Sequence, residues 1–143
     1  VDVVLQGLWK FGNDWVFDSR LSYTYQKAQD FTDKSDKDTY GGQISYIPWH
    51  SGSAILNAGY KSWELNYSFI YTGERYDVSA NTPENYRLPW YTSDFSLAKK
   101  FSWRKYDFKL TLEVNNIFNQ QYEVVRSYPM PGTNFKFILN LTI

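Results

Sequence analysis

Apolar and polar residues alternate along most of this chain, and this two-residue period constrains the fold more than any other feature of the sequence. In residues 106–114 every even position is apolar, and the odd positions carry three charges. Six other segments follow the same alternation, residues 54–60 most weakly; they are 1–11, 15–25, 54–60, 63–72, 91–101 and 134–143. Side chains of a β-strand point alternately to opposite faces of the sheet, so the pattern predicts an all-β chain of about seven strands.

The connections between these expected strands alternate between short and long. The short turns lie at Gly12–Asp14, Lys61–Ser62 and Ser102–Lys105, and the long loops lie at about 30–52, 75–90 and 117–133. Such an arrangement predicts an antiparallel up-and-down meander whose two ends differ, as in barrels of the outer-membrane type. A strand of about ten residues rises roughly 33 Å and, tilted by about 45°, covers roughly 23 Å, which is close to the apolar band of such a barrel.

The chemistry of the two faces favours a membrane barrel. The polar faces carry charged residues, and the apolar faces carry aromatic residues close to the strand ends, namely Trp9, Trp15, Trp63, Tyr71, Tyr91 and Tyr106. Tyr and Trp rings at strand ends are typical of the membrane–water interface. A soluble antiparallel sheet that packs the same apolar faces into a core produces the same period and remains the alternative.

Composition excludes several classes of function. Fifteen Lys and Arg residues balance fifteen Asp and Glu residues, so a nucleic-acid partner is not expected. Without cysteine and with His50 as the one histidine, we expect no thiolate or histidine-rich metal site, no cofactor and no catalytic triad, and hence no enzyme. Four aspartates in residues 30–38 could bind calcium, but an EF-hand glycine and glutamate are missing, and a solvated loop is favoured.

Three motifs resemble a known family. Residues 113–143 read EVNNIFNQQYEVVRSYPMPGTNFKFILNLTI, and this run resembles the C-terminal end of TonB-dependent outer-membrane receptors. Ile47–Ser53 (IPWHSGS) and Tyr71–Tyr76 (YTGERY) resemble two upstream motifs of the same family, in the same order. The sequence departs from the family at Thr133, where Arg is common, and at Ile143, where the family usually has Phe or Trp.

The resemblance implies that residues 1–143 are the C-terminal segment of a larger barrel. Transporters of this kind have about 22 strands, so seven strands would form about a third of the wall. The plug domain, the TonB-contacting segment and the N-terminal strands are then expected to lie outside this chain. Because two strand edges and an apolar face would be left open, we expect the isolated segment to self-associate.

The resemblance also implies a function and a location. The expected function is import of a scarce nutrient, such as a siderophore, a cobalamin-like compound or a glycan, across the outer membrane of a Gram-negative bacterium. Its expected partners are outer-membrane lipid, the remainder of the barrel and its plug, TonB through the missing part, and an unidentified small molecule. A soluble aromatic-rich β-domain that binds carbohydrate is the alternative function.

Ligand contacts are expected in the long loops and at the adjoining strand ends. Amphipathic rings with occasional arginines suit such a ligand, although they equally suit a membrane interface. The candidate residues are Trp49, His50, Tyr76, Tyr86, Arg87, Trp90, Tyr122, Arg126 and Tyr128.

Three loop segments have mainly structural interpretations. Tyr128–Gly132 (YPMPG) predicts a rigid turn, because its two prolines fix φ and remove two backbone donors. The amides of Asn115 and Asn116 are expected to bind backbone groups where a strand ends. Glu74 and Arg75 are expected to form an exposed pair that adds little stability.

Overall fold

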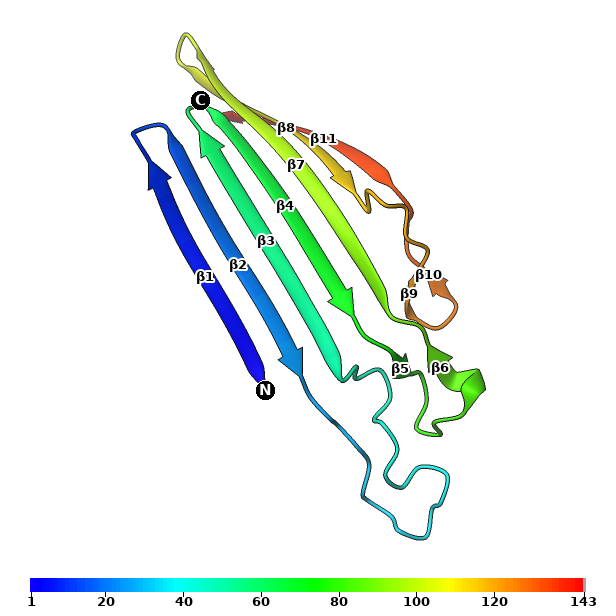
Figure 1. Ribbon diagram of the computed structural model, residues 1–143. Coiled ribbons are helices and arrows are strands. Elements are labelled where there is room, and N and C mark those ends of the chain that lie inside the picture. Colours follow the sequence, from blue (N-terminus) through cyan, green and yellow to red (C-terminus); the bar gives the residue numbers. More distant parts are fainter. Residues whose placement is uncertain (143) are drawn as a thin grey trace.

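The computed structural model describes residues 1–142, and its main feature is one seven-stranded antiparallel sheet. The long strands are β1 (Asp2–Phe11), β2 (Trp15–Tyr25), β3 (His50–Tyr60), β4 (Trp63–Thr72), β7 (Trp90–Trp103), β8 (Tyr106–Asn115) and β11 (Asn134–Thr142). Each long strand pairs with its predecessor and its successor along the chain, so the predicted meander is confirmed (Figure 1). Ile143, expected on the apolar face, lies outside the described residues.

The strand boundaries differ from prediction at two places. β3 begins at His50 rather than at residue 54, since residues 50–53 are polar or small and continue the ladder with β2 without an apolar alternation. β7 continues to Trp103, so the last short turn contains only Arg104 and Lys105. Loop segments also form short elements that the pattern did not reveal, namely β5 (Arg75–Tyr76), η1 (Pro83–Asn85), β6 (Tyr86–Arg87), β9 (Glu123–Val125) and β10 (Tyr128–Pro129).

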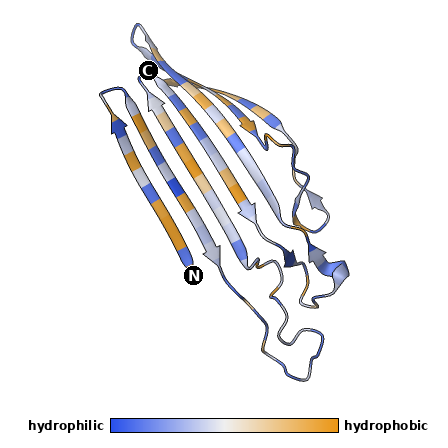
Figure 2. Cartoon of the chain, in the orientation of Figure 1, coloured by the Kyte–Doolittle hydropathy of each residue, from blue (hydrophilic) through white to orange (hydrophobic). Residues whose placement is uncertain are grey.

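The strand register gathers the apolar side chains on one face of the sheet. Residues directly opposite each other in an antiparallel pair point to the same face. One such row crosses five strands, through Ala58, Leu65, Leu97, Leu112 and Phe137. In Figure 2 the hydrophobic and hydrophilic residues accordingly form alternating bands along the strands.

No second layer of structure covers this apolar face. Phe135 and Phe137 are 76% and 65% exposed, and Ala98 is the one apolar side chain that residues 1–142 bury. A soluble β-domain packs its apolar face into a core. The described residues contain no such core. This absence fits the wall of a membrane barrel, whose apolar face is covered by lipid. Within the same residues, no helix is long and apolar enough to cross a membrane.

Aromatic residues on the apolar face cluster near both ends of the strands. Beside the short turns, Trp15 stacks on Tyr60 with ring centroids 4.3 Å apart. Lys99 lies on the same face, and its Nζ is 4.3 Å from the ring centroid of Trp63. A lysine beside an indole near a strand end can keep its charge at the membrane surface. At the opposite strand ends, Nδ1 of His50 is hydrogen-bonded to the hydroxyl of Tyr23 at 2.7 Å.

The other face of the sheet is polar, and its side chains bond to one another across strands. The amide of Asn57 donates to Asp18 and accepts from Asn66, which links β2, β3 and β4. Glu64 accepts from both Lys100 and Lys109. Charged and amide groups in lateral contact satisfy each other beside water, so this face suits the interior of a barrel.

Gly73, directly after β4, is a position where an added side chain would meet the backbone of the neighbouring strand. Its N–H donates to the carbonyl of His50 at 2.8 Å, and an added Cβ would lie 2.7 Å from that same oxygen. We therefore expect Gly73→Ala to destabilise the complete receptor by about 1–3 kcal/mol, measured by denaturant unfolding in lipid vesicles. Gly59→Ala is the control, because its Cβ would meet nothing closer than 3.8 Å. Equal stability of the two variants would contradict the steric argument.

Candidate ligand site at the loop end

All three long connections lie at one end of the sheet, opposite the short turns (Figure 1). We name them loop A (residues 26–49), loop B (residues 73–89) and loop C (residues 116–133). Loop A meets loop B where the N–H of Tyr46 donates to the carbonyl of Tyr76 at 2.8 Å. The three loops therefore need to be considered as one structure rather than as separate flexible connections.

Arg75 joins loop B to loop C. Its side chain is 3% exposed, and its Nη2 donates to the carbonyls of Glu123 at 2.9 Å and Val124 at 3.2 Å. Burial lowers the pKa of this guanidinium, which nevertheless stays charged at neutral pH. The expectation of an exposed Glu74–Arg75 pair is wrong, because loop C covers Arg75 and supplies backbone acceptors for it.

Asp77 is the acidic centre of the same contact. Its carboxylate is fully buried, and its Oδ2 accepts from Nε of Arg87 at 2.7 Å as well as from Nη2. Nη1 of Arg126, from loop C, lies 3.6 Å from the same oxygen. Two predicted ligand-binding arginines are therefore paired with a carboxylate, which reduces the positive charge that they offer to a ligand.

Gln43 and Asn81 join loop A to loop B. The side-chain oxygen of Asn81 accepts from the N–H of Gln43, and its amide nitrogen donates to the Gln43 carbonyl at 3.1 Å. Gln43 is 7% exposed and donates its own amide to the Ile47 carbonyl at 2.7 Å. These reciprocal bonds fix the spacing of the two loops.

Asn116 organises loop C from the end of β8. Its side-chain nitrogen donates to the carbonyls of Gln120 at 2.9 Å and Pro131 at 3.2 Å, and its oxygen accepts from the N–H of Gln120. The predicted role of this amide in binding backbone groups is confirmed. The residue has a φ of 51°, a left-handed conformation that asparagine adopts more readily than most residues.

A hollow of about 290 Å³ lies between loop A and loop B, and we name it the A–B hollow. Three predicted ligand residues line it, namely Trp49, Tyr76 and Tyr86, together with Gln29, Gly41, Gln43, Glu74 and Asn81. The rings of Tyr76 and Tyr86 pack edge to face with centroids 5.7 Å apart. Burial, reinforced by the charge of Glu74, raises the pKa of Tyr86, so its hydroxyl stays neutral at physiological pH.

A second hollow of about 420 Å³ lies between loop B and loop C. Its lining includes Tyr86, Arg87, Trp90 and Tyr122. The rings of Trp90 and Tyr122 stack with centroids 4.5 Å apart. Burial raises the pKa of Tyr122, with a smaller contribution from Asp94. Four of the nine predicted residues therefore share this second hollow.

Three predicted residues line neither hollow. His50 packs against Tyr23 and Tyr25 on the apolar side of the sheet, with a ring separation of 5.1 Å from Tyr25. Arg126 contacts Asp77, and Tyr128 is 71% exposed in the β9–β10 hairpin. A ligand role for each of the nine residues stays a prediction.

Polar residues of the A–B hollow were missed by sequence reasoning. Gln29, Gln43 and Asn81 belong to no recognisable sequence motif, so nothing in the sequence favoured them over other loop residues. Aromatic residues stand out by type, whereas an amide becomes informative only once its hydrogen-bond partners are known.

The acidic segment of loop A is stabilised by its own backbone. Asp30 and Asp33 each accept from the N–H two residues further along, at 2.8 Å. The side-chain hydroxyls of Thr32 and Ser35, followed by these backbone N–H groups, lower the pKa of the two carboxyl groups. Such local turns are characteristic of aspartate. Among residues 1–142, no group of three or more acidic or histidine side chains is placed to hold a metal ion.

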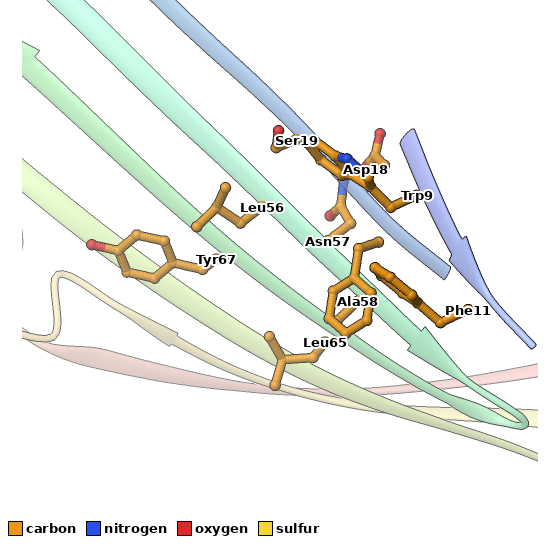
Figure 3. A pocket seen from close by; sticks show the side chains of 10 residues that line it. Trp9, Phe11, Asp18, Ser19, Leu56, Asn57, Ala58, Leu65 and Tyr67 are labelled. Carbon is orange, nitrogen blue, oxygen red and sulfur yellow. The ribbon is translucent and has the colours of Figure 1, made fainter. Parts of the chain in front are cut away.

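A larger hollow, of about 580 Å³, lies far from the loops on the apolar face (Figure 3). Its lining includes Trp9, Phe11, Leu56, Leu65 and Tyr67, with the small side chain of Ala58 at its base. Asp18, Ser19 and Asn57 also border the hollow, but Asp18 and Asn57 bond to each other and the hydroxyl of Tyr67 bonds to Ser93, so most of its lining is apolar. The hollow therefore suits hydrocarbon chains, and the candidate ligand site remains at the loops.

Comparison with known proteins agrees with this geometry. A family model described as "TonB dependent receptor-like, beta-barrel" matches residues 1–117, which contain every long strand except β11. Comparison with curated protein sequences gives no significant match. The matched family comprises receptors and transporters of the Gram-negative outer membrane. A piece of such a barrel should be a single-layer meander with one apolar face, one polar face and long loops at one end, as this sheet is. The chain therefore belongs to the TonB-dependent receptor family, as a segment of its outer-membrane β-barrel.

Proposed function

We propose that residues 1–143 form the C-terminal part of a receptor barrel that imports a scarce nutrient across the outer membrane, be it a siderophore, a cobalamin-like compound or a glycan. The observation that carries this proposal is the mutual locking of loops A, B and C around two hollows lined with aromatic rings. Loops that are ordered before the ligand arrives lose less entropy on binding, so a preformed site captures a dilute nutrient more tightly.

The two faces of the sheet support our proposals for the remaining partners. The apolar face contacts lipid, and the polar face, with Asp18, Asn57 and Asn66, contacts water or the plug inside the barrel. β1 and β11 each have one unpaired edge within the described sheet, and these edges pair with the rest of the barrel. TonB acts through a part of the receptor outside residues 1–143, and the isolated segment self-associates through its open edges and apolar face.

Deletion of the receptor gene is expected to abolish uptake of one of the three nutrient classes, and a plasmid copy is expected to restore it. Uptake should be measured with a radiolabelled ferric siderophore, cyanocobalamin and neutral oligosaccharides, each with and without TonB. Receptors carrying Trp90→Ala or Tyr122→Ala are expected to need about tenfold more ligand, because each loses one partner of a stacked pair. Unchanged uptake of all three classes after deletion would refute the proposed import function.

A further inference from the structure

The A–B hollow has the size for one ring of a ligand. Its volume of about 290 Å³ is at the lower end of the range of roughly 300–1,000 Å³ for small-molecule sites. A whole ferric chelate or corrinoid would not enter such a volume. Both loops contribute walls to the hollow, and the hydrogen bonds between Gln43 and Asn81 fix the distance between the two loops. The shape of the hollow is therefore defined by specific contacts.

The A–B hollow offers both acceptors and donors, and among the donors the Nε1–H of Trp49 is buried without a partner in residues 1–142. The amide nitrogen of Gln29 is already bonded to the carbonyl of Gly41 at 2.6 Å, and that of Gln43 to the carbonyl of Ile47 at 2.7 Å. Within residues 1–142, neither the Oε1 atoms of these two glutamines nor the carboxylate of Glu74 accept a hydrogen bond, so they are available to a ligand. A complementary ligand must therefore both donate and accept hydrogen bonds, as hydroxyl groups do.

The charge of the lining argues against an anion. Among the described residues that line the A–B hollow, Glu74 is the one with a charged side chain. The nearby ammonium of Lys27 lies over the ring of Trp49, 5.2 Å from its centroid. An anionic ligand such as a ferric catecholate would meet a carboxylate without a compensating cation, which opposes binding.

Aromatic rings supply the remaining contact surface. Trp49, Tyr76 and Tyr86 contribute flat, partly apolar faces to the hollow. A pyranose ring combines a face of C–H groups, which packs on such rings, with a rim of hydroxyl donors for carboxylate and amide oxygens. We propose that the A–B hollow binds one sugar ring of an uncharged glycan. This assignment rests on the proposed import function and names the class of nutrient.

The experiment is titration calorimetry of the complete receptor in detergent micelles. The probes are neutral oligosaccharides of glucose, xylose, mannose and galactose, ferric tris-catecholate as an anionic chelate, and choline as an organic cation. At least one neutral oligosaccharide is expected to bind saturably. Tyr76→Ala is expected to weaken that binding by about tenfold, since a buried aromatic contact is lost, and Glu74→Gln by about threefold or more.

Matched variants separate loss of a contact from loss of folding. Tyr76→Phe keeps the ring and is expected to restore most of the affinity that Tyr76→Ala loses. Val78→Ala, at an exposed position of loop B outside the hollow, is expected to bind within about twofold of the unmodified receptor. Unchanged affinity in both Tyr76→Ala and Glu74→Gln would overturn the assignment of the site.

Two further outcomes would also overturn the assignment. One is absence of binding by every neutral oligosaccharide, and the other is binding of ferric tris-catecholate or choline that depends on Tyr76. If the gene deletion still abolishes uptake of a nutrient, either result refutes the sugar assignment alone and leaves the import function standing. If the deletion changes no uptake, the import function itself fails.

Discussion

Leu112→Arg is expected to destabilise the folded receptor by about 2–4 kcal/mol, which is the cost of a charged side chain on the lipid-facing side near the middle of a barrel. Leu112 lies between Leu97 and Phe137 in the apolar rows of the sheet and is 51% exposed, away from the aromatic residues at both strand ends. In a barrel that exposed surface is in contact with hydrocarbon, where a guanidinium loses its hydration.

The neighbouring residue provides the matched control. Thr111 lies on the same strand but points to the polar face, between Ala98 and Ile138. Arginine there would extend into the wet interior of the barrel, so Thr111→Arg is expected to change stability by less than about 1 kcal/mol. The measurement is reversible denaturant unfolding of the complete receptor in phospholipid vesicles, with both variants titrated under the same conditions.

Opposite behaviour of the two variants would invalidate the assignment of the faces. If Thr111→Arg were the more damaging change, the polar face would be the one in contact with lipid. If both variants were equally destabilising, the sheet would be packed on both faces, as in a soluble protein. A difference of the predicted sign confirms the orientation of every strand at once, because the register ties all seven strands to the same alternation.

The sheet could be predicted because its signal is local. A side chain's face depends only on its position along a strand, so Phe108, Leu110 and Leu112 reveal their common face without knowledge of any partner. The same locality explains the error at β3, where His50, Ser51 and Gly52 belong to the strand but carry no apolar alternation. Their strand conformation comes from pairing with neighbours on both sides, which sequence periodicity does not record.

The loop contacts could not be predicted because they join residues far apart in the chain. Arg75 bonds to carbonyls 48 and 49 residues away, and those acceptors are backbone groups that any residue type would provide. The aromatic candidates were identified by residue type, and six of the nine line one of the two hollows. Their grouping into two hollows, and the separation of His50 from both, depends on loop conformations that only the structure reveals.

Asp77→Ala is expected to have the second large effect, which should be confined to the loops. Asp77 carries the one carboxylate bonded to Arg87, and Arg126 approaches the same oxygen. Removing one partner of a buried ion pair costs about 3–5 kcal/mol, and we expect the lower end here because the side chain of Arg87 is 26% exposed. Arg75 and Arg87 would then repel each other without compensation, and loops B and C would separate.

Hydrogen exchange of the complete receptor can locate this effect. Asp77→Ala is expected to accelerate amide exchange by at least about a hundredfold in residues 74–88 and 120–128. This factor corresponds to a loss of roughly 3 kcal/mol of local stability. The amides of β3, β4 and β8 are expected to keep their protection. Lys61→Ala is the control at the opposite end of the sheet, where the 3.9 Å pair with Asp14 is more than half exposed on both sides. Loss of that exposed pair should leave exchange unchanged.

A double-mutant cycle separates the ion pair from a general effect on loop folding. Arg87→Met removes the charge while keeping much of the aliphatic bulk, and the cycle compares each single variant with the Asp77→Ala/Arg87→Met double variant. Asp77→Ala leaves the partly buried charge of Arg87 without its carboxylate, and Arg87→Met leaves the buried Asp77 with only the longer contact to Arg126. The summed costs of the single variants are therefore expected to exceed the cost of the double variant, with a coupling of about 1.5 kcal/mol or more. If the stability costs of the two single variants simply added up in the double variant, Asp77 would support the loop conformation without a specific interaction with Arg87. Ligand affinity should then fall equally in the single and double variants. With coupling, the double variant should recover part of the lost affinity, because the charge of Arg87 no longer repels Arg75 between loops B and C.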